Sequence, residues 1–165
     1  MIVREADFKD LKYIEFLSKK ENRALGFIPK IAYEAAITGV KNGKRWSNVC
    51  NDKLFVCSEN NDLVGFLLMS YGQWAKVNQI AIQEDARMIE RGKRLLQAGI
   101  DHGIKAKRQD FMCGCADDLE SNFFWKCVGW KKLGERKGIS HKNTWKETSK
   151  RKINVYHFQL NSLFF

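Results

Sequence analysis

The chain contains only one proline, Pro29, and no segment rich in glycine, serine or proline. Such segments usually separate domains, so their absence predicts a single domain over residues 1–165. No apolar run reaches the roughly 18 to 20 residues that a transmembrane helix needs. The first residues also lack the basic-then-apolar pattern of a secretory signal peptide. We therefore expect a cytoplasmic protein that has no membrane partner.

Patterns of metal ligands and of disulfides are missing as well. The five cysteines, at positions 50, 57, 113, 115 and 127, are odd in number and lack C-x-x-C spacing. None of the histidines forms a pair near them in the sequence, so we expect neither a bound metal nor a disulfide framework. Cys113 and Cys115 share one face of a predicted strand, and we expect both to be buried in a sheet.

The chain has fewer acidic than basic residues: 19 Asp and Glu against 29 Lys and Arg, which gives a formal net charge of +10. Between residues 121 and 152 there are ten basic residues and two acidic ones. This surplus favours an anionic partner such as nucleic acid or an acidic protein. A basic surface that is merely solvated is the alternative.

Residues 138–152 form a long polar connection between two predicted strands, 130–137 and 153–160. Long connections in compact domains are often functional. This basic loop contains Trp145 between Lys142 and Lys146, and an aromatic ring among cations can stack on a base or hold a phosphate. Together with Trp46, these residues are our candidates for contacts with the substrate or partner.

The remaining chain alternates between strand and helix patterns. Residues 1–17 predict a short strand and then an amphipathic helix that begins near Asp7 or Asp10. Residues 53–72 predict a hairpin that turns at Asn60 and Asn61. Two further strands are predicted at residues 76–83 and 111–116.

Residues 79–96, QIAIQEDARMIERGKRLL, run from a half-buried strand through an arginine-rich turn into a helix. Unpaired N–H groups and the positive end of the dipole at a helix start suit a phosphate or diphosphate. Ile82, Arg87 and Gly92 fall where the Gcn5-related N-acetyltransferase (GNAT) family has the end of its fourth strand and its RxxGxG/A turn. Residues 122–130, NFFWKCVGW, resemble the FYxxxGF segment of that family, with Trp125 at the Tyr position.

This resemblance implies an α+β (α/β) fold: a mixed, mostly antiparallel central sheet, flanked by helices and splayed between its fourth and fifth strands. It also implies acetyl-CoA (or another acyl-CoA) as the donor, with the acetyl carbonyl at the backbone N–H of about Ile82. The residues implied in binding this cofactor are Ile80, Ile82, Arg87, Met88, Ile89, Glu90, Arg91, Gly92, Lys93, Arg94, Asp118, Phe124 and Trp125. Glu90 departs from the family pattern, and its carboxylate would repel a diphosphate unless it points away or pairs with Arg94.

The activity that the resemblance implies is transfer of the acetyl group to an amine. The surplus of basic residues favours an acceptor that is anionic or linked to nucleic acid. Members of the family often use a Tyr to protonate the departing thiolate, whereas the indole of Trp125 can donate only a hydrogen bond. Tyr71 and Tyr156 are the possible substitutes, and Glu84 or Asp118 could act as the base.

Two functions from different classes stay open. One is an N-acyltransferase that acts on a small-molecule or macromolecular amine. The other is a degenerate module of the same fold that binds CoA or nucleic acid without turnover. The sequence leaves the oligomeric state open, with a homodimer among the options.

Overall fold

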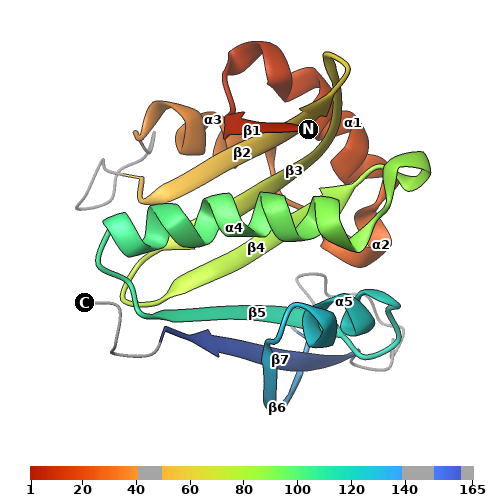
Figure 1. The fold of residues 1–165 in the computed structure, drawn as a ribbon, viewed down its shortest axis with the longest axis vertical. Coiled ribbons are helices and arrows are strands. Elements are labelled where there is room, and N and C mark those ends of the chain that lie inside the picture. The colour runs from red at the N-terminus through yellow and green to blue at the C-terminus, as the bar shows by residue number, and fades with distance from the viewer. Residues whose placement is uncertain (41–49, 139–150, 161–165) are drawn as a thin grey trace, which may run out of the picture.

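The structure is a computed structural model that describes residues 1–40, 50–138 and 151–160. Within these residues the strands form one seven-stranded sheet with the order β1-β2-β3-β4-β5-β7-β6 (Figure 1). The strands are β1 (Ile2–Glu5), β2 (Asp52–Glu59), β3 (Asp62–Tyr71), β4 (Ala75–Ile82), β5 (Asp110–Ala116), β6 (Lys131–Lys137) and β7 (Lys152–Gln159). β4 and β5 are parallel, and the other neighbouring strands pair antiparallel. The predicted mixed, mostly antiparallel sheet is confirmed.

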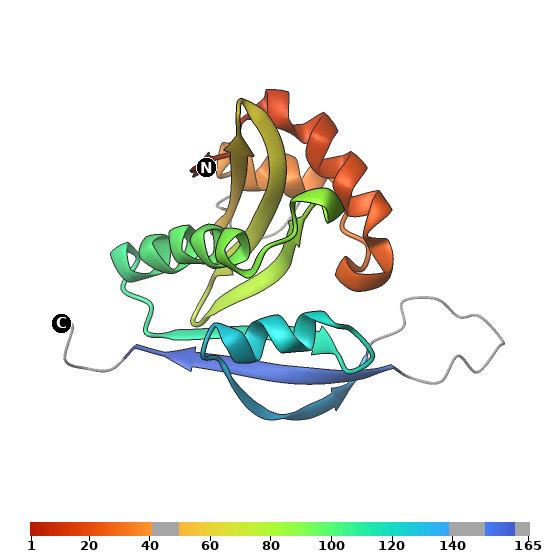
Figure 2. The same cartoon turned by 45° about the vertical axis from the view of Figure 1, so that its right-hand side comes forward.

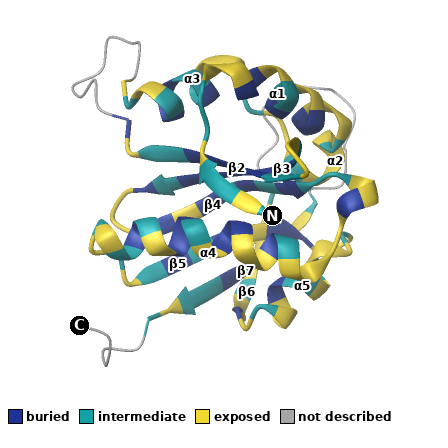
Figure 3. Ribbon diagram, turned by 45° about the horizontal axis from the view of Figure 1, so that its top comes forward, coloured by how far each residue is buried: buried dark blue, intermediate teal, exposed yellow. Residues whose placement is uncertain are grey.

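Helices cover both faces of this sheet. They are α1 (Leu11–Lys20), α2 (Asn22–Leu25), α3 (Lys30–Thr38), α4 (Ile89–Lys105) and α5 (Ser121–Cys127), with 3-10 turns η1 (Phe8–Asp10) and η2 (Glu84–Ala86). Alternate residues of a strand point to opposite faces. Thus Leu54 and Val56 of β2 pack with α1 and α3, whereas Phe55 and Cys57 pack in the cluster that contains α4. Figure 3 shows exposed residues along the outer sides of these helices and buried residues along the strands of the sheet.

The local signals in the sequence act as predicted. Asp7 caps η1 through the Lys9 N–H at 2.9 Å, and the buried Asp10 accepts two hydrogen bonds from Arg4 at 2.7 and 2.8 Å. The β2–β3 hairpin turns at Asn60 and Asn61, whose φ angles of 50° and 72° belong to a tight hairpin turn. These features fix the first strand, the first helix and the hairpin that carry one half of the sheet.

β4 and β5 lie side by side only at their beginnings. Their ladder ends where Val77 pairs with Cys113, although β4 continues to Ile82 and β5 to Ala116. A register shift opposite Leu68 and Met69 leaves Asn78 as an extra residue in β4, and such a bulge bends the strand. The two strands therefore diverge, and Figure 2 shows the sheet opening into a β1–β4 part and a β5–β7–β6 part. The predicted splay is confirmed.

Candidate functional site

A cleft of about 990 Å³ occupies the space where β4 and β5 diverge. Its walls come from both strands, from the junction of α1 and α2, from the start of α4 and from α5. Residues that line it include Glu21, Arg23, Asn78, Ile80, Ile82, Arg87, Met88, Ile89, Gly92, Cys115, Asp118, Phe124 and Trp125. Elements that are far apart in the sequence thus build one site.

The free edge of β4 forms one side of the cleft. The Gln83 N–H donates to the Val64 carbonyl on β3 at 2.8 Å, and N–H groups along a strand point alternately to its two sides. The N–H groups of Ile80 and Ile82 therefore point away from β3, towards the cleft. Arg87 Nε donates to the Ile82 carbonyl at 3.2 Å, which places the backbone of Ile82 on the same side. Because the β4–β5 ladder ends at Val77, this edge can bind a ligand amide or carbonyl.

The first turn of α4 closes one end of the cleft. Met88 is the N-cap residue, and its side chain makes no capping hydrogen bond. Inside the turn, the N–H groups of Arg91 and Gly92 donate to the Met88 carbonyl at 3.1 and 3.3 Å. Met88, Ile89 and Gly92 line the cleft, so the positive end of the dipole of this 17-residue helix faces it. This arrangement suits an anionic group.

No protein-family model matches the sequence, and a search of curated proteins gives no match. Solved structures are similar in fold. A ribosomal-protein-alanine N-acetyltransferase from Brucella melitensis has a TM-score of 0.72 at 13% identity, over 97% of this chain and 100% of that one. An acetyltransferase from Salmonella typhimurium that modifies the N-terminal serine of a 50S ribosomal subunit protein has a TM-score of 0.74 at 16% identity, over 96% and 94%.

A second Salmonella typhimurium structure, described as an acetyltransferase with its cofactor acetyl-CoA, has a TM-score of 0.74 at 14% identity, over 98% of this chain and 94% of that one. These likenesses span nearly the whole chain and agree with the splayed sheet. The chain has the GNAT fold. At such low sequence identity the similarity shows the fold alone. Evidence for an activity therefore has to come from the residues of the cleft.

The turn that the GNAT resemblance assigns to acetyl-CoA contributes only some of its residues to the cleft. Arg87, Met88, Ile89 and Gly92 line it, as do Ile80 and Ile82 of β4. Arg91 points elsewhere, because its guanidinium pairs with Glu59 on β2 and donates to the Ala86 carbonyl at 2.6 Å. The structure therefore gives Arg91 a role in joining α4 to the β2–β3 hairpin.

Glu90, Lys93 and Arg94 are exposed on the outer side of α4 and are not part of the cleft lining that the described residues form. The Glu90 carboxylate thus points away from the place where it would repel a diphosphate. The departure of residue 90 from the GNAT pattern leaves the anion site at the start of α4 intact. Lys93 and Arg94 can attract a polyanion only over a longer distance through solvent.

Gly92 lies against the ring of Phe124 from α5. A Cβ atom on residue 92 would stand 2.7 Å from Cε2 and 3.0 Å from Cζ of that ring. The sequence predicts both as cofactor-binding residues, and both line the cleft. The structure adds that the absence of a side chain at residue 92 lets α5 approach α4.

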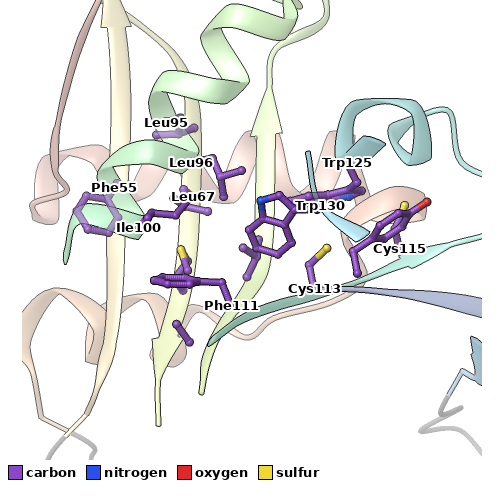
Figure 4. Packing of buried hydrophobic residues seen from close by; sticks show 14 of the residues in the cluster. Phe55, Leu67, Leu95, Leu96, Ile100, Phe111, Cys113, Cys115, Trp125 and Trp130 are labelled. Carbon is purple, nitrogen blue, oxygen red and sulfur yellow. The ribbon is translucent and has the colours of Figure 1, made fainter. Parts of the chain in front are cut away.

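Trp125 is a buried packing residue at the inner wall of the cleft, where Figure 4 shows it near Cys115. Its ring lies 4.9 Å from that of Trp130 and stacks at 6.3 Å on Tyr156, and it is a hydrogen-bond partner of the Cys115 thiol. Burial raises the pKa of Cys115, so this thiol is a poor nucleophile. The Tyr156 hydroxyl donates to Asn122 Oδ1 at 3.0 Å, which gives it a structural role.

The prediction of Tyr71 as a catalytic group is wrong. Tyr71 pairs with Ala75 at the far end of β4 and is almost fully buried. Its hydroxyl donates to the Gly99 carbonyl at 2.7 Å, and burial raises its pKa. Sequence alternation placed this residue on a strand, but only the hairpin geometry shows that it lies at the closed end of the sheet.

The two candidate bases are also poorly placed for catalysis. Glu84 is exposed, lies 3.7 Å from Lys20 and borders a separate hollow of about 450 Å³ with Asp85 and Phe16. Asp118 does line the cleft, but both its oxygens accept from Arg151, at 2.8 and 3.0 Å. The hydrogen bond from Arg151 holds the pKa of Asp118 below its usual value, which makes the carboxylate a weak base.

Two site residues were beyond the reach of the sequence analysis. Glu21 lines the cleft and places its carboxylate 2.6 Å from the Arg87 guanidinium. Gln79 is buried, accepts from Tyr33 at 2.6 Å and donates to the carbonyls of Leu25 and Gly26 at 3.3 and 3.2 Å. No local motif marks either residue, because each acts through a partner far away in the chain.

The predicted partner residues Trp46, Lys142, Trp145 and Lys146 lie outside the described residues, as does most of the basic loop. In the part of the chain that the structure describes, no cluster of three or more His, Cys, Asp or Glu side chains could hold a metal ion. No helix of that part is both long and apolar enough to cross a bilayer.

Proposed function

We propose that the protein is an N-acyltransferase that moves the acetyl group of acetyl-CoA to an amine. The observation that carries this proposal is the combination of the free β4 edge and the uncapped start of α4 in one cleft. The cleft has the size of a typical ligand site. A protein of the same fold is described with acetyl-CoA as its cofactor.

The residues present fit the chemical parts of acetyl-CoA. The start of α4 and Arg87 would hold the diphosphate. The resemblance implied the N–H of about Ile82 as the donor to the acetyl carbonyl. Because Ile82 adjoins the α4 turn, we assign it instead to the pantetheine arm, and we assign the acetyl carbonyl to the N–H of Ile80, one strand repeat deeper. Apolar side chains of Ile89, Leu119 and Phe124 line the path.

In the transfer, the amine nitrogen forms a bond to the acetyl carbon, the carbon–sulfur bond breaks, and the thiolate of CoA leaves. The Ile80 N–H would polarise the carbonyl and stabilise the charge that develops on its oxygen. Of the described acids that line the cleft, Glu21 and Asp118 are paired with arginines and Glu120 is exposed to solvent, so we assign proton removal to water. Positioning of the amine next to the thioester would then supply most of the rate.

An anionic acceptor or partner is the finer part of this proposal. Tyr156 of β7 points towards α5, so its neighbours on either side in the strand point to the opposite face of the sheet. Lys131 pairs with His157 and Arg136 with Ile153, which places both cations on that face. Arg136 Nη2 lies 3.4 Å from the position of a Cβ on Gly114, a residue of the cleft. Cations therefore border the side of the cleft opposite to α4.

Residues 121–138 and 151–160 contain seven Lys and Arg and one acidic residue. The neighbours of known fold include enzymes whose acceptors are ribosomal proteins. Those acceptors are macromolecular amines, and ribosomes are rich in RNA. A nucleic-acid-linked amine would suit the basic face of this chain.

The activity is tested by incubating the protein with acetyl-CoA and an amine mixture while the free thiol of CoA is measured. Thiol release that depends on the amine and is lost in Arg87→Gln supports an enzyme. Tight binding without amine-dependent release would instead favour the degenerate binding module.

The anionic partner is tested by a salt titration of binding to single-stranded and duplex oligonucleotides. The log–log slope should be about −0.7 to −0.9 per phosphate neutralised. Changing Lys131 and Arg136 together to Gln should make the slope shallower by roughly one to two units. If the affinity for oligonucleotides is the same in the wild type and the variant, the acceptor would instead be a small anionic amine.

A further inference from the structure

Glu21 and Arg87 form an ion pair across the mouth of the cleft, with 2.6 Å between Oε1 and Nη2. Glu21 follows the last residue of α1 and precedes α2, and Arg87 follows η2 in the turn before α4. Arg87 also donates from Nε to the Ile82 carbonyl. The guanidinium best placed for a phosphate of the cofactor is thus already bound to a carboxylate of the protein.

We propose that Glu21 is a built-in competitor of the cofactor: its carboxylate holds Arg87 in the free protein and is displaced when the diphosphate of acetyl-CoA binds. This inference rests on the proposed function. It makes the Glu21–Arg87 pair an autoinhibitory contact that sets the affinity for acetyl-CoA.

Electrostatics favours displacement over a shared site. A phosphate that accepts from Arg87 stands within a few ångströms of the carboxylate that contacts the same guanidinium, and like charges repel strongly at that separation. The Glu21 side chain is only 18% exposed, whereas that of Arg87 is 51% exposed, so water screens the repulsion in part and the carboxylate itself is poorly solvated. Glu21 also stands at the C-terminal end of α1, where the helix dipole disfavours a negative charge.

Displacement of Glu21 would loosen one end of α2. The C-terminal end of α2 is held by Gln79, which donates to the Leu25 and Gly26 carbonyls. Near the start of α2, Arg151 donates to the Arg23 carbonyl at 2.6 Å, and the Arg23 side chain lies 3.5 Å from Asp118. The Glu21–Arg87 pair ties the beginning of α2 to the turn before α4. Binding of acetyl-CoA would therefore remove one of the contacts that hold the start of a helix in the cleft wall, and this end of α2 would become more mobile before the acceptor enters.

The experiment is a calorimetric titration of acetyl-CoA into wild type, Glu21→Gln, Arg87→Gln and the double variant. Glu21→Gln should bind about 5- to 50-fold more tightly, the range of a typical coupling between two ligands of one site. Arg87→Gln should bind at least about tenfold more weakly, as expected for loss of a charge-assisted contact. In the Arg87→Gln background, Glu21→Gln should improve the affinity by less than about threefold, the effect of removing a charge alone, because the competition needs Arg87.

Glu120→Gln is the matched control, because Glu120 lines the same cleft but makes no ion pair with Arg87 among the described residues. It removes the same charge and should improve affinity by less than about threefold, because the long-range repulsion that it removes is weak. If Glu21→Gln binds acetyl-CoA no more tightly than wild type, or gains no more affinity than the Glu120→Gln control, Glu21 does not compete with the cofactor. The assignment of acetyl-CoA to the cleft would still stand. If wild type fails to bind acetyl-CoA, the proposed function itself is wrong.

Hydrogen exchange of α2 (Asn22–Leu25) gives a readout independent of affinity. Acetyl-CoA should speed up amide exchange there in wild type, and ligand-free Glu21→Gln should already exchange at the faster rate. Slower exchange in wild type on binding would overturn the coupling between the cofactor and α2.

Discussion

A Cβ atom on Gly92 would stand 2.7 Å from Cε2 of Phe124. α4 and α5 therefore meet so closely that any larger residue at this position would have to push the Phe124 ring aside, and both residues belong to the wall of the cleft. The small residue of the GNAT turn thus shapes the site through helix packing as well as through access to the backbone.

Gly92→Ala should lower the free energy of unfolding by about 1–3 kcal/mol, because the added methyl group must push the Phe124 ring aside. Acetyl-CoA affinity should fall with it, since the same ring lines the cleft. Denaturant unfolding and calorimetry measure the two effects. Gly134→Ala is the control, because no atom lies within 4 Å of a Cβ there. In the double variant Gly92→Ala/Phe124→Leu, the smaller residue 124 should recover part of the acetyl-CoA affinity. If Gly92→Ala alone has the stability and affinity of wild type, the packing argument is wrong.

Trp125→Phe should keep most of the turnover, because the indole packs against Trp130 and Tyr156 and contributes no proton. The smaller ring should cost up to about 3 kcal/mol of stability through the space it leaves. Thiol release from acetyl-CoA and thermal unfolding report the two quantities. A loss of turnover of about 10³-fold, the size expected for removal of a group that stabilises the transition state, would assign the indole a chemical role if folding and affinity stay intact.

Gln79→Met should destabilise the protein by about 1–3 kcal/mol, because it removes the donor to the Leu25 and Gly26 carbonyls and leaves the Tyr33 hydroxyl only Ser18 as a buried partner. α2 should also become more exposed to exchange and proteolysis. Gln97→Met is the matched control, since Gln97 bonds to Asp101 at the surface. Equal stability of the two variants would show that the Gln79 network does not hold α2.

Stability in acid should depend on the pair of Asp118 and Arg151. The Arg151 hydrogen bond lowers the pKa of Asp118 from its ordinary value of 3.8. The folded protein therefore binds this proton less readily than the unfolded chain, so the pair stabilises the fold above that value and the gain is lost as the pH falls through the lowered pKa. Arg151→Gln should raise the pH at which acid unfolding occurs, while the exposed Lys126→Gln should not. An unchanged acid midpoint in Arg151→Gln would contradict this account.

The sequence predicted the secondary structure well where the signal was local. The predicted strand at residues 111–116 differs from β5 (Asp110–Ala116) by one residue, and the hairpin turns at the predicted asparagines. The splay between β4 and β5 followed from the family resemblance. Ile82, Arg87 and Gly92 carried that resemblance, and all three line the cleft.

The side-chain roles failed where distant partners decide them. Arg91 turns away from the cleft because Glu59, 32 positions earlier, lies within its reach. Tyr71 is buried because the C-terminal half of α4 packs over it. Its hydroxyl donates to the carbonyl of Gly99, 28 positions later. Such pairings depend on how the elements pack, which periodicity and local motifs do not encode.

The most direct test of the central claim is an amide-resolved NMR titration of the protein with acetyl-CoA. If the ligand lies along the free edge of β4, the amides of Ile80 and Ile82 and those at the start of α4 should shift and become protected from exchange. The amides of Gln79 and Ala81, which face β3, should change much less. Saturable binding that leaves Ile80 and Ile82 unchanged would contradict the assignment of acetyl-CoA to this cleft.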